Sequence, residues 1–331
     1  MSGRPLLAVE DLSVAIPTAR GLLHAVNQVA LTLERGSTLG IVGESGCGKT
    51  MLSRALLQLL PRKAKLSGRI RFDGRDLLSL SKEALRKLRG KEIAVVFQDP
   101  MTSLNPVLTV GSQLIETLHE HLGLGQSAAS ERAVALLAAV GIPAPAQRLR
   151  QYPHQLSGGM RQRVAIAIAL SCEPRLLIAD EPTTALDVTV QAQILDLLAR
   201  EQRQRQMAMV LITHDLGVVA GRTDEVAVMY AGRIVEQAPT RILFKDMRMP
   251  YTAALLAAIP KLESPPHTPL AAIGGKPPDP TRPMPGCAFA PRCDRAAPNC
   301  RERAPGLTAA AGAGHQYSCW RPLGTGERAV A

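Results

Sequence analysis

Aromatic residues are scarce in this chain of 331 residues, which contains four Phe, four Tyr and one Trp. A nucleic-acid binder is one interpretation of the formal net charge of +11. So few aromatic side chains leave little on which bases could stack, and the basic residues are scattered along the chain. A solvated basic face, or attraction to anionic lipid at a bilayer, fits the charge better. We therefore expect no nucleic-acid partner.

Long apolar runs are also missing. No stretch approaches the roughly 18 residues that a membrane-spanning helix needs. Glu10 and Asp11 interrupt the apolar start of the chain, which argues against a signal peptide. The alternation of Leu7, Val9 and Leu12 with polar residues indicates a strand instead. We expect the chain to stay in the cytoplasm unless another chain holds it to a membrane.

Short apolar segments alternate with helix-like segments over most of the chain. Strands are expected at residues 39–42, 93–97, 176–179 and 209–213, and a helix is expected after the first of them, through Leu60. Strands separated by helices predict an α/β fold whose parallel sheet is covered on both faces. Residues from about 100 to 171 are expected to form a helical lobe. Nine prolines between Pro260 and Pro285 predict an irregular linker before a tail domain.

A glycine-rich stretch follows the first of these strands. Residues 43–50 read GESGCGKT and match the P-loop pattern GxxxxGK[ST] between a strand and a helix. Glycines let backbone N–H groups point at phosphate oxygens, and the helix adds its positive N-terminal end. Lys49 should bridge the β- and γ-phosphates, and Thr50 should ligate Mg²⁺. The predicted ATP-binding residues of this stretch are Gly43, Glu44, Ser45, Gly46, Cys47, Gly48, Lys49, Thr50 and Met51.

Two carboxylates follow a later apolar strand. Residues 176–181 read LLIADE, and the end of a buried parallel strand is where ligands bind in open α/β sheets. Asp180 can hold Mg²⁺ through water, and Glu181 can polarise the attacking water. Both could be ordinary acids at a strand end, but their combination with a P-loop favours catalysis.

A second phosphate-seeking helix start precedes this acid pair. Residues 156–163 read LSGGMRQR, in which Ser157 is a good N-cap and two glycines open a helix. With this stretch the sequence resembles the ABC ATPase family, whose signature is LSGGQ, and Met160 is the departure. The resemblance covers residues 5 to about 237 and implies nucleotide contacts from Ser157, Gly158 and Gly159.

The remaining family elements appear in order. Gln98 is similar to the Q-loop glutamine, a Mg²⁺ and catalytic residue, and residues 185–187 (ALD) resemble the D-loop, whose Asp187 implies a further nucleotide-site contact. His214 resembles the switch histidine. The family also implies a P-loop NTPase (RecA-like) core with an antiparallel β subdomain and the helical subdomain. We expect the nucleotide-binding domain at residues 1–237 and a small irregular C-terminal domain at residues 238–331.

The family resemblance also implies a dimer. Two such domains clamp two ATP molecules head to tail, so that the P-loop of one faces Ser157 and Gly159 of the other. The family usually stacks adenine on an aromatic residue before the P-loop, but the first aromatic here is Phe72, and the equivalent position is Arg20. A guanidinium can stack on a purine, and a solvated turn arginine is the open alternative.

Two stretches point to a subfamily. Residues 97–106 (FQDPMTSLNP) are similar to the Q-loop region of dipeptide, oligopeptide and nickel importers, and residues 286–293 (GCAFAPRC) resemble the C-terminal extension of peptide-permease ATPases. This implies an ATPase subunit that powers peptide import from the cytoplasmic face of the inner membrane. Its partners would be a second, non-identical ATPase, two transmembrane subunits and an extracytoplasmic binding protein. A nickel or other small-solute importer, a small-molecule exporter and a non-transport ABC ATPase are the alternatives.

Four cysteines crowd into the tail with the spacing C-x₅-C-x₆-C-x₁₈-C. Without a secretion signal, such a cluster indicates metal or iron–sulfur ligation before disulfides. Four thiolates satisfy a 4Fe–4S cluster, which the peptide-permease resemblance also favours, and Zn²⁺ in a Cys₄ site is the alternative. The predicted ligands are Cys287, Cys293, Cys300 and Cys319.

Overall fold

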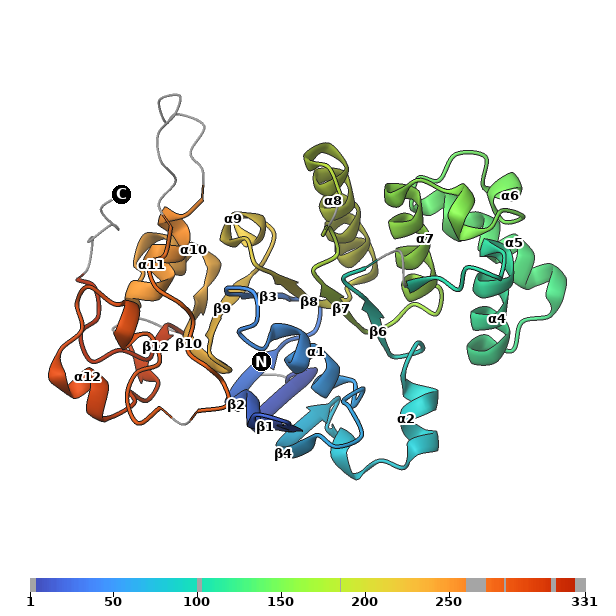
Figure 1. Ribbon diagram of the computed structural model, residues 1–331. Helices are drawn as coiled ribbons and strands as arrows, with labels where there is room; N and C mark the ends of the chain where they lie inside the picture. Colours follow the sequence, from blue (N-terminus) through green and yellow to red (C-terminus); the bar gives the residue numbers. More distant parts are fainter. Residues whose placement is uncertain are drawn as a thin grey trace. The chain divides into compact units, whose positions relative to one another are not determined.

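A computed structural model describes residues 4–99, 103–184, 186–259, 272–282, 284–310 and 314–324. The chain folds into two compact units. Figure 1 shows its helices and strands, coloured along the sequence. The first unit holds Met1–Leu33, Thr38–Leu78 and Leu211–Ala331, and the second holds Glu34–Ser37 and Ser79–Val210.

The first unit begins with an antiparallel sheet of order β2-β1-β4-β5. Strand β1 (Leu7–Thr18) pairs with β2 (Gly21–Leu33) on one side and β4 (Lys65–Phe72) on the other, and β5 (Arg75–Asp76) pairs with β4. The apolar residues that alternate along β1 are its buried face, so the predicted N-terminal strand is confirmed. They are Leu7, Val9, Leu12 and Val14.

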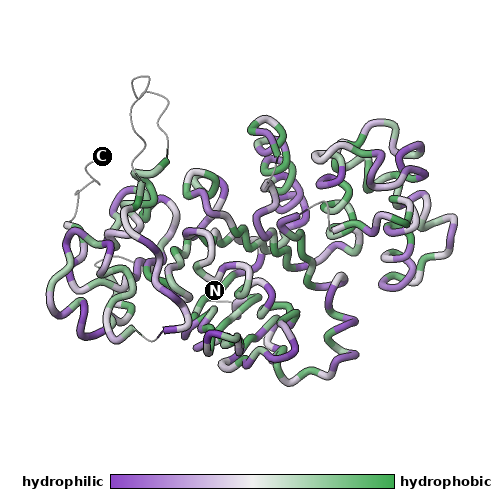
Figure 2. Tube along the Cα trace, viewed as in Figure 1, coloured by the Kyte–Doolittle hydropathy of each residue, from purple (hydrophilic) through white to green (hydrophobic). Residues whose placement is uncertain are grey.

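A second sheet of this unit carries the phosphate loop. The strands of this sheet that lie within the first unit follow the order β11-β12-β10-β9-β3, and β3 runs parallel to β9. The bounds are β3 (Thr38–Val42), β9 (Glu225–Tyr230), β10 (Arg233–Pro239), β11 (Thr308–Ala309) and β12 (Gln316–Tyr317). All five residues of β3 are buried, and the strand is a hydrophobic stretch of the trace (Figure 2). A fully buried parallel strand explains why its sequence is a continuous apolar run.

Helix α1 (Lys49–Leu56) follows the loop directly. It is shorter than the helix through Leu60 that the sequence predicts. Gln58 adopts a left-handed φ of 50°, and Pro61 cannot continue a helix. The chain therefore leaves the helical path one turn early.

The second unit combines two parallel strands with a set of helices. Strand β6 (Ile93–Val96) pairs in parallel with β7 (Leu176–Asp180), and β8 (Ala208–Thr213) runs from this unit into the first. The helices are α2 (Lys82–Leu88), α4 (Val110–Leu122), α5 (Gln126–Ala139), α6 (Pro145–Arg148), α7 (Gly158–Leu170) and α8 (Val188–Arg205). The four predicted strands are confirmed, and with them the α/β fold with its helical subdomain.

Side-chain caps fix where several of these helices start. The oxygen of each cap residue accepts a hydrogen bond from a backbone N–H of the first turn, which would otherwise lack an intrahelical partner. The cap residues are Ser81 for α2, Thr109 for α4, Ser157 for α7 and Asp187 for α8. Two of these caps belong to the predicted functional motifs, so local sequence sets the positions of both motifs.

The C-terminal region belongs to the first unit. It contains α9 (Leu216–Val219), α10 (Thr240–Lys245), α11 (Pro250–Ala257), a single turn at Ala290–Arg292 and α12 (Pro298–Glu302). Strand β12 pairs with β10, and this pairing joins the tail to the sheet of the phosphate loop. Residues 260–271 and Pro283 of the predicted linker lie outside the described residues. The domain boundary at residue 237, a position within β10, stays a prediction.

Within the described ranges, no helix combines the length and apolar character needed to cross a membrane.

One buried carboxylate ties the tail to the sheet. The Glu236 side chain is fully buried in β10 and accepts hydrogen bonds from the backbone N–H groups of Arg248 (2.6 Å) and Met249 (3.2 Å). The Nε2 atom of His315, a residue just before β12, lies 2.9 Å from its Oε1 atom. A buried carboxylate needs such partners to offset its lost hydration.

We expect Glu236→Ala to lower the free energy of unfolding by about 3 kcal/mol, because three polar groups lose their shared acceptor. Denaturant unfolding of the purified chain measures this loss. The matched control is Glu10→Ala, because Glu10 forms a half-exposed ion pair with Arg71. That change should cost less than about 1 kcal/mol. Equal losses in the two variants would contradict the anchoring role of Glu236.

Candidate functional site

The phosphate loop is shaped by two glycines that press against neighbouring backbone. A Cβ atom on Gly43 would lie 2.2 Å from the carbonyl oxygen of Met229, and one on Gly48 would lie 2.1 Å from that of Ala25. Gly48 also has a φ of 108°, which side-chain-bearing residues rarely adopt. Gly46, by contrast, faces open space. The loop therefore packs against backbone at Gly43 and Gly48 and is open at Gly46, as a phosphate-binding loop requires.

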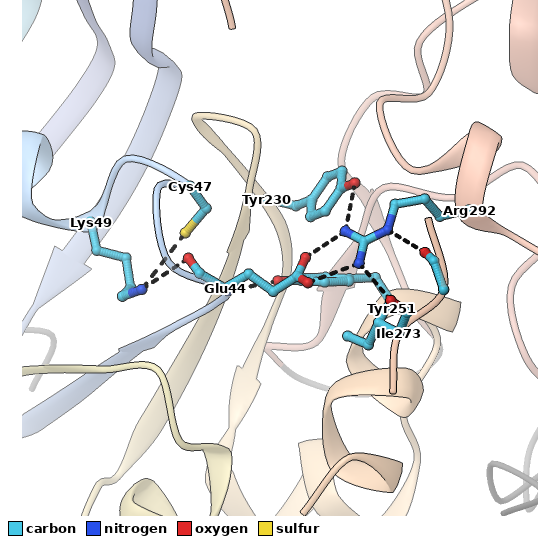
Figure 3. A network of polar contacts seen from close by, with 8 residues as sticks. Glu44, Cys47, Lys49, Tyr230, Tyr251, Ile273 and Arg292 are labelled. Atoms are coloured by element: carbon cyan, nitrogen blue, oxygen red, sulfur yellow. Dashed lines mark hydrogen bonds and ion pairs between the residues drawn. The ribbon is translucent and has the colours of Figure 1, made fainter. Parts of the chain in front are cut away.

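Lys49 lies inside this curl. Its side chain is 4% exposed, and its Nζ atom donates to the carbonyl oxygens of Gly43 (2.7 Å) and Glu44 (3.1 Å), as Figure 3 shows for Glu44. Thr50 and Met51 follow in the first turn of α1, and Ser45 is exposed on the open side. Curled backbone, an ammonium group and a helix start are thus present together, and they fit a bound phosphate chain.

Cys47 turns its thiol inward in the same loop. Its Sγ atom lies 4.0 Å from Nζ of Lys49, and burial raises the pKa of the thiol. A neutral buried thiol behaves as a small apolar side chain. We interpret Cys47 as loop packing, and its backbone as the part that would face a nucleotide.

The second unit brings a glutamine and a carboxylate together. Strands β6 and β7 pair in parallel with Val96 opposite Ala179, so their carboxyl ends meet at one edge of the sheet. Gln98 follows β6 and Glu181 follows β7, and Nε2 of Gln98 donates to Oε2 of Glu181 over 3.0 Å. The hydroxyl of Thr184 donates to the same oxygen over 3.1 Å. The structure thus brings two separately predicted catalytic candidates, Gln98 and Glu181, into contact at this edge.

Asp180 and Glu181 point to different surroundings. Asp180 is the last residue of β7 and is 1% exposed, whereas Glu181 is half-buried and adopts a left-handed φ of 46°. A non-glycine residue in this conformation is uncommon and occurs often at functional sites. The turn aims the two neighbouring carboxylates differently, which suits one for a buried role and the other for contact with water.

The signature segment lies against the start of α8. Ser157 caps α7, and its hydroxyl accepts from the N–H of Met160 over 3.3 Å. A Cβ atom on Gly159 would lie 2.8 Å from Cγ1 of Val190, so only glycine allows α7 to approach α8 this closely. Asp187 caps α8 and accepts from the N–H of Val190 over 2.9 Å. The signature and the predicted D-loop are therefore brought together, with Ser157, Gly158 and Asp187 exposed.

Two predicted residues of the first unit are exposed. Arg20 lies in the turn between β1 and β2, where its backbone N–H donates to the Thr18 hydroxyl over 3.2 Å. His214 follows β8 directly. Ala185 of the predicted D-loop and residues 100–102 of the predicted Q-loop lie outside the described residues. The roles of all these site residues stay predictions.

The sequence reasoning missed two contacts. Thr184 was not singled out, although it shares the carboxylate oxygen of Glu181 with Gln98. Arg292 was not singled out either, although it forms an ion pair with Glu44 of the phosphate loop. One signal was available for the second contact, because an acidic residue within an anion-binding loop requires a compensating cation.

The predicted iron–sulfur cluster is wrong. Among the residues that the structure describes, no three His, Cys, Asp or Glu side chains are grouped so that they could hold a metal ion. This finding removes both the 4Fe–4S cluster and the zinc alternative for Cys287, Cys293, Cys300 and Cys319. All four cysteines are free thiols.

These thiols are buried or half-buried. Burial raises the pKa of Cys287 and Cys293, and it raises the pKa of Cys319 to about 11, with a smaller contribution from the neighbouring cysteines. Spacing in the sequence indicated a ligand set that the side chains do not form.

Two families match the chain. The ABC transporter family matches residues 26–184, and the C-terminal region of oligopeptide/dipeptide transporters matches residues 235–300. The dipeptide transport ATP-binding protein DppD of Bacillus subtilis is 48% identical over 98% of this chain and 97% of its own length. The oligopeptide transport ATP-binding protein OppD of Salmonella typhimurium is 48% identical over 96% of this chain and 94% of its own length.

Solved structures match the fold. CbiO1 of Clostridium perfringens, part of the ABC transporter complex cbiONQ, has a TM-score of 0.62 and 31% identity over 73% of this chain and 91% of its own. The ATP-binding cassette MJ0796, a dimer in a post-hydrolysis state with ADP and Pi, has a TM-score of 0.63 and 27% identity. The match covers 71% of this chain and 99% of that one.

The position of Lys49 gives a test of the loop. Lys49→Ala should weaken ATP binding by about 2 kcal/mol, roughly thirtyfold, because a charged donor to phosphate is lost. Titration of the purified chain with a fluorescent ATP analogue measures the change. The control is Lys65→Ala, which removes an exposed lysine from β4 and should leave affinity unchanged. An unaltered affinity in Lys49→Ala would exclude the loop as the phosphate site.

Proposed function

The chain belongs to the ABC transporter family, and from this membership we propose that it is the ATP-hydrolysing subunit that drives import of dipeptides and oligopeptides. It converts ATP and water to ADP and phosphate and couples this reaction to transport. The observation that carries the proposal is the near full-length likeness to peptide-transport ATP-binding proteins, which includes the peptide-transporter C-terminal region. A nickel or other small-solute importer and a non-transport ATPase are not favoured by these relatives.

The phosphate loop binds the triphosphate in this proposal. Backbone N–H groups of residues 43–50 face the phosphate oxygens, and the Lys49 ammonium moves from carbonyl partners to the β- and γ-phosphates. Thr50 and Gln98 would ligate Mg²⁺, and Asp180 would help to hold it through water. When bound, Mg²⁺ neutralises negative charge on the β- and γ-phosphates. Arg20 is the proposed stacking partner for adenine.

Glu181 acts on the attacking water. Its carboxylate, held by Gln98 and Thr184, accepts the proton of the water as it attacks the γ-phosphate. His214 contacts the γ-phosphate, and Gln98 links occupancy of the site to the helical lobe. The two hydrogen bonds to Oε2 hold the Glu181 carboxylate in one orientation, so that Oε1 can stay directed at the water.

A second ATPase completes the site. Ser157, Gly158, Gly159 and Asp187 serve the nucleotide bound to a partner chain, in the head-to-tail arrangement of the family. Support comes from the exposure of Ser157, Gly158 and Asp187 at the starts of α7 and α8, where a second chain can reach them. The partner is a different ATPase subunit. The other partners are two transmembrane subunits and an extracytoplasmic binding protein, so this chain is a peripheral protein on the cytoplasmic face of the membrane.

Glu181→Gln tests both hydrolysis and transport. The variant should still bind ATP and should stabilise the dimer, while hydrolysis falls by about 10²–10⁴ because the general base is lost. Proteoliposomes that contain the complete transporter should then take up no labelled di- or tripeptide. The matched control is Glu173→Gln, which neutralises an exposed glutamate of the second unit. Turnover of Glu181→Gln within a few-fold of the wild type would assign the base to another residue. Uptake of nickel but not of peptide by the wild-type transporter would reassign the substrate.

The proposed partner gives a second test. The purified chain alone should be largely monomeric and should hydrolyse ATP slowly, because its signature helix is proposed to contact the nucleotide of a different ATPase subunit. Light scattering after size exclusion, with and without Mg-ATP, measures the oligomeric state. Addition of the second ATPase subunit should restore cooperative turnover. A stable homodimer with rapid, cooperative hydrolysis would count against the non-identical pair.

A further inference from the structure

Glu44 presents an electrostatic problem within the phosphate loop. It is the second residue of a loop that binds anions, and a carboxylate there repels a triphosphate. Lys49 contacts the backbone carbonyl of Glu44, and the side chain of Glu44 is drawn to the other side (Figure 3). The carboxylate is 24% exposed, so water offsets its charge only in part.

Arg292 of the C-terminal region meets this carboxylate with both terminal nitrogens. One guanidinium nitrogen donates to Oε2 over 2.6 Å and the other to Oε1 over 2.8 Å. The two residues are 248 positions apart in the chain. Paired parallel contacts of this kind are among the strong charge-assisted hydrogen bonds and have a defined geometry.

The guanidinium group is itself held on every side. Its Nε atom donates to the carbonyl oxygen of Gly274 (2.7 Å), and its terminal nitrogens donate to the carbonyl of Ile273 (3.1 Å) and the hydroxyl of Tyr230 (3.3 Å). It lies 5.9 Å from the ring centroid of Phe289 and is 3% exposed. The hydrogen bond to Glu44 raises the pKa of Arg292 above its usual value, and a guanidinium stays protonated in proteins.

The backbone of Glu44 is fixed from the same side. Its N–H donates to the hydroxyl of Tyr251 over 2.9 Å, and Tyr251 is fully buried. The rings of Tyr251, Tyr230 and Phe289 pack together, with centroids 4.5 to 5.4 Å apart. Glu44 is thus held by both main chain and side chain against a rigid aromatic support.

We propose that Arg292 is a positioning residue for ATP, which neutralises Glu44 and holds its carboxylate away from the phosphate-binding side of the loop. The proposal rests on the proposed role of residues 43–50 in ATP binding. Arg292 does not touch the nucleotide in this account, because its donors are taken by Glu44, Tyr230 and two backbone carbonyls. The C-terminal region, through this one side chain, sets the affinity of the phosphate loop.

Substitutions of Arg292 separate charge from packing. Arg292→Met and Arg292→Gln both remove the cation, so ATP affinity of the full chain should fall about tenfold, and the loss should shrink at high salt as charge is screened. Arg292→Lys keeps the cation and should stay within about threefold of the wild type. The Gln variant provides the measurement if the Met variant does not fold.

Removal of the opposing charge is the decisive arm. If Arg292 acts by neutralising Glu44, the double variant Arg292→Met/Glu44→Gln should recover most of the affinity lost in Arg292→Met. A merely structural role would give a double variant at least as weak as the single one, and that result would overturn the proposal. Unchanged affinity in the folded Met or Gln variant would overturn it as well.

The matched control is Arg248→Met. Arg248 is likewise an arginine of the C-terminal region with polar partners, Asp246 (2.8 Å) and the carbonyl oxygen of Leu323 (3.1 Å), and neither partner belongs to the phosphate loop. This variant should lose stability but keep its ATP affinity. A wild-type chain that binds no ATP would instead defeat the proposed function itself, which keeps the two failures apart.

Discussion

Contact of backbone with backbone at the phosphate loop is the constraint on which the rest of the first unit depends. Gly43 and Gly48 bring the loop so close to Met229 and Ala25 that no side chain could fit between them. The loop therefore takes its shape from β9 and β2, and not from its own residues alone. Lys49 and the main chain of Glu44 depend on this packing, because a displaced loop would break the hydrogen bonds of Lys49 to Gly43 and of Glu44 to Tyr251.

Much of the fold could be predicted because its signals are local. Four apolar strands lie where the sequence placed them, since a buried parallel strand needs a continuous apolar run. Ser157 and Asp187 cap their helices, as short polar side chains at helix starts do. The P-loop glycines and Lys49 lie between a strand and a helix, as their local pattern predicts. Strands, helix caps and the phosphate loop are thus determined by residues close together in the sequence.

The rest depends on distant residues that no local pattern identifies. Arg292 reaches Glu44 only after the tail has paired with β10 through β12, and nothing near Arg292 in the sequence names its partner. The spacing of the four tail cysteines led to a wrong prediction of a metal site. Spacing in the sequence gives the number of thiols but not how they are grouped in space. Long-range geometry decides both cases.

The bond between Arg292 and Glu44 also has a consequence for inheritance. A chain that acquired a different C-terminal region would leave an acidic residue unbalanced in its phosphate loop, and a chain that lost this acid would keep a buried arginine without its anion. Either change alone would leave one charge of the pair uncompensated, so residues 44 and 292 are expected to be substituted together or retained together. The loop and the tail, although far apart in the chain, then evolve as a single module.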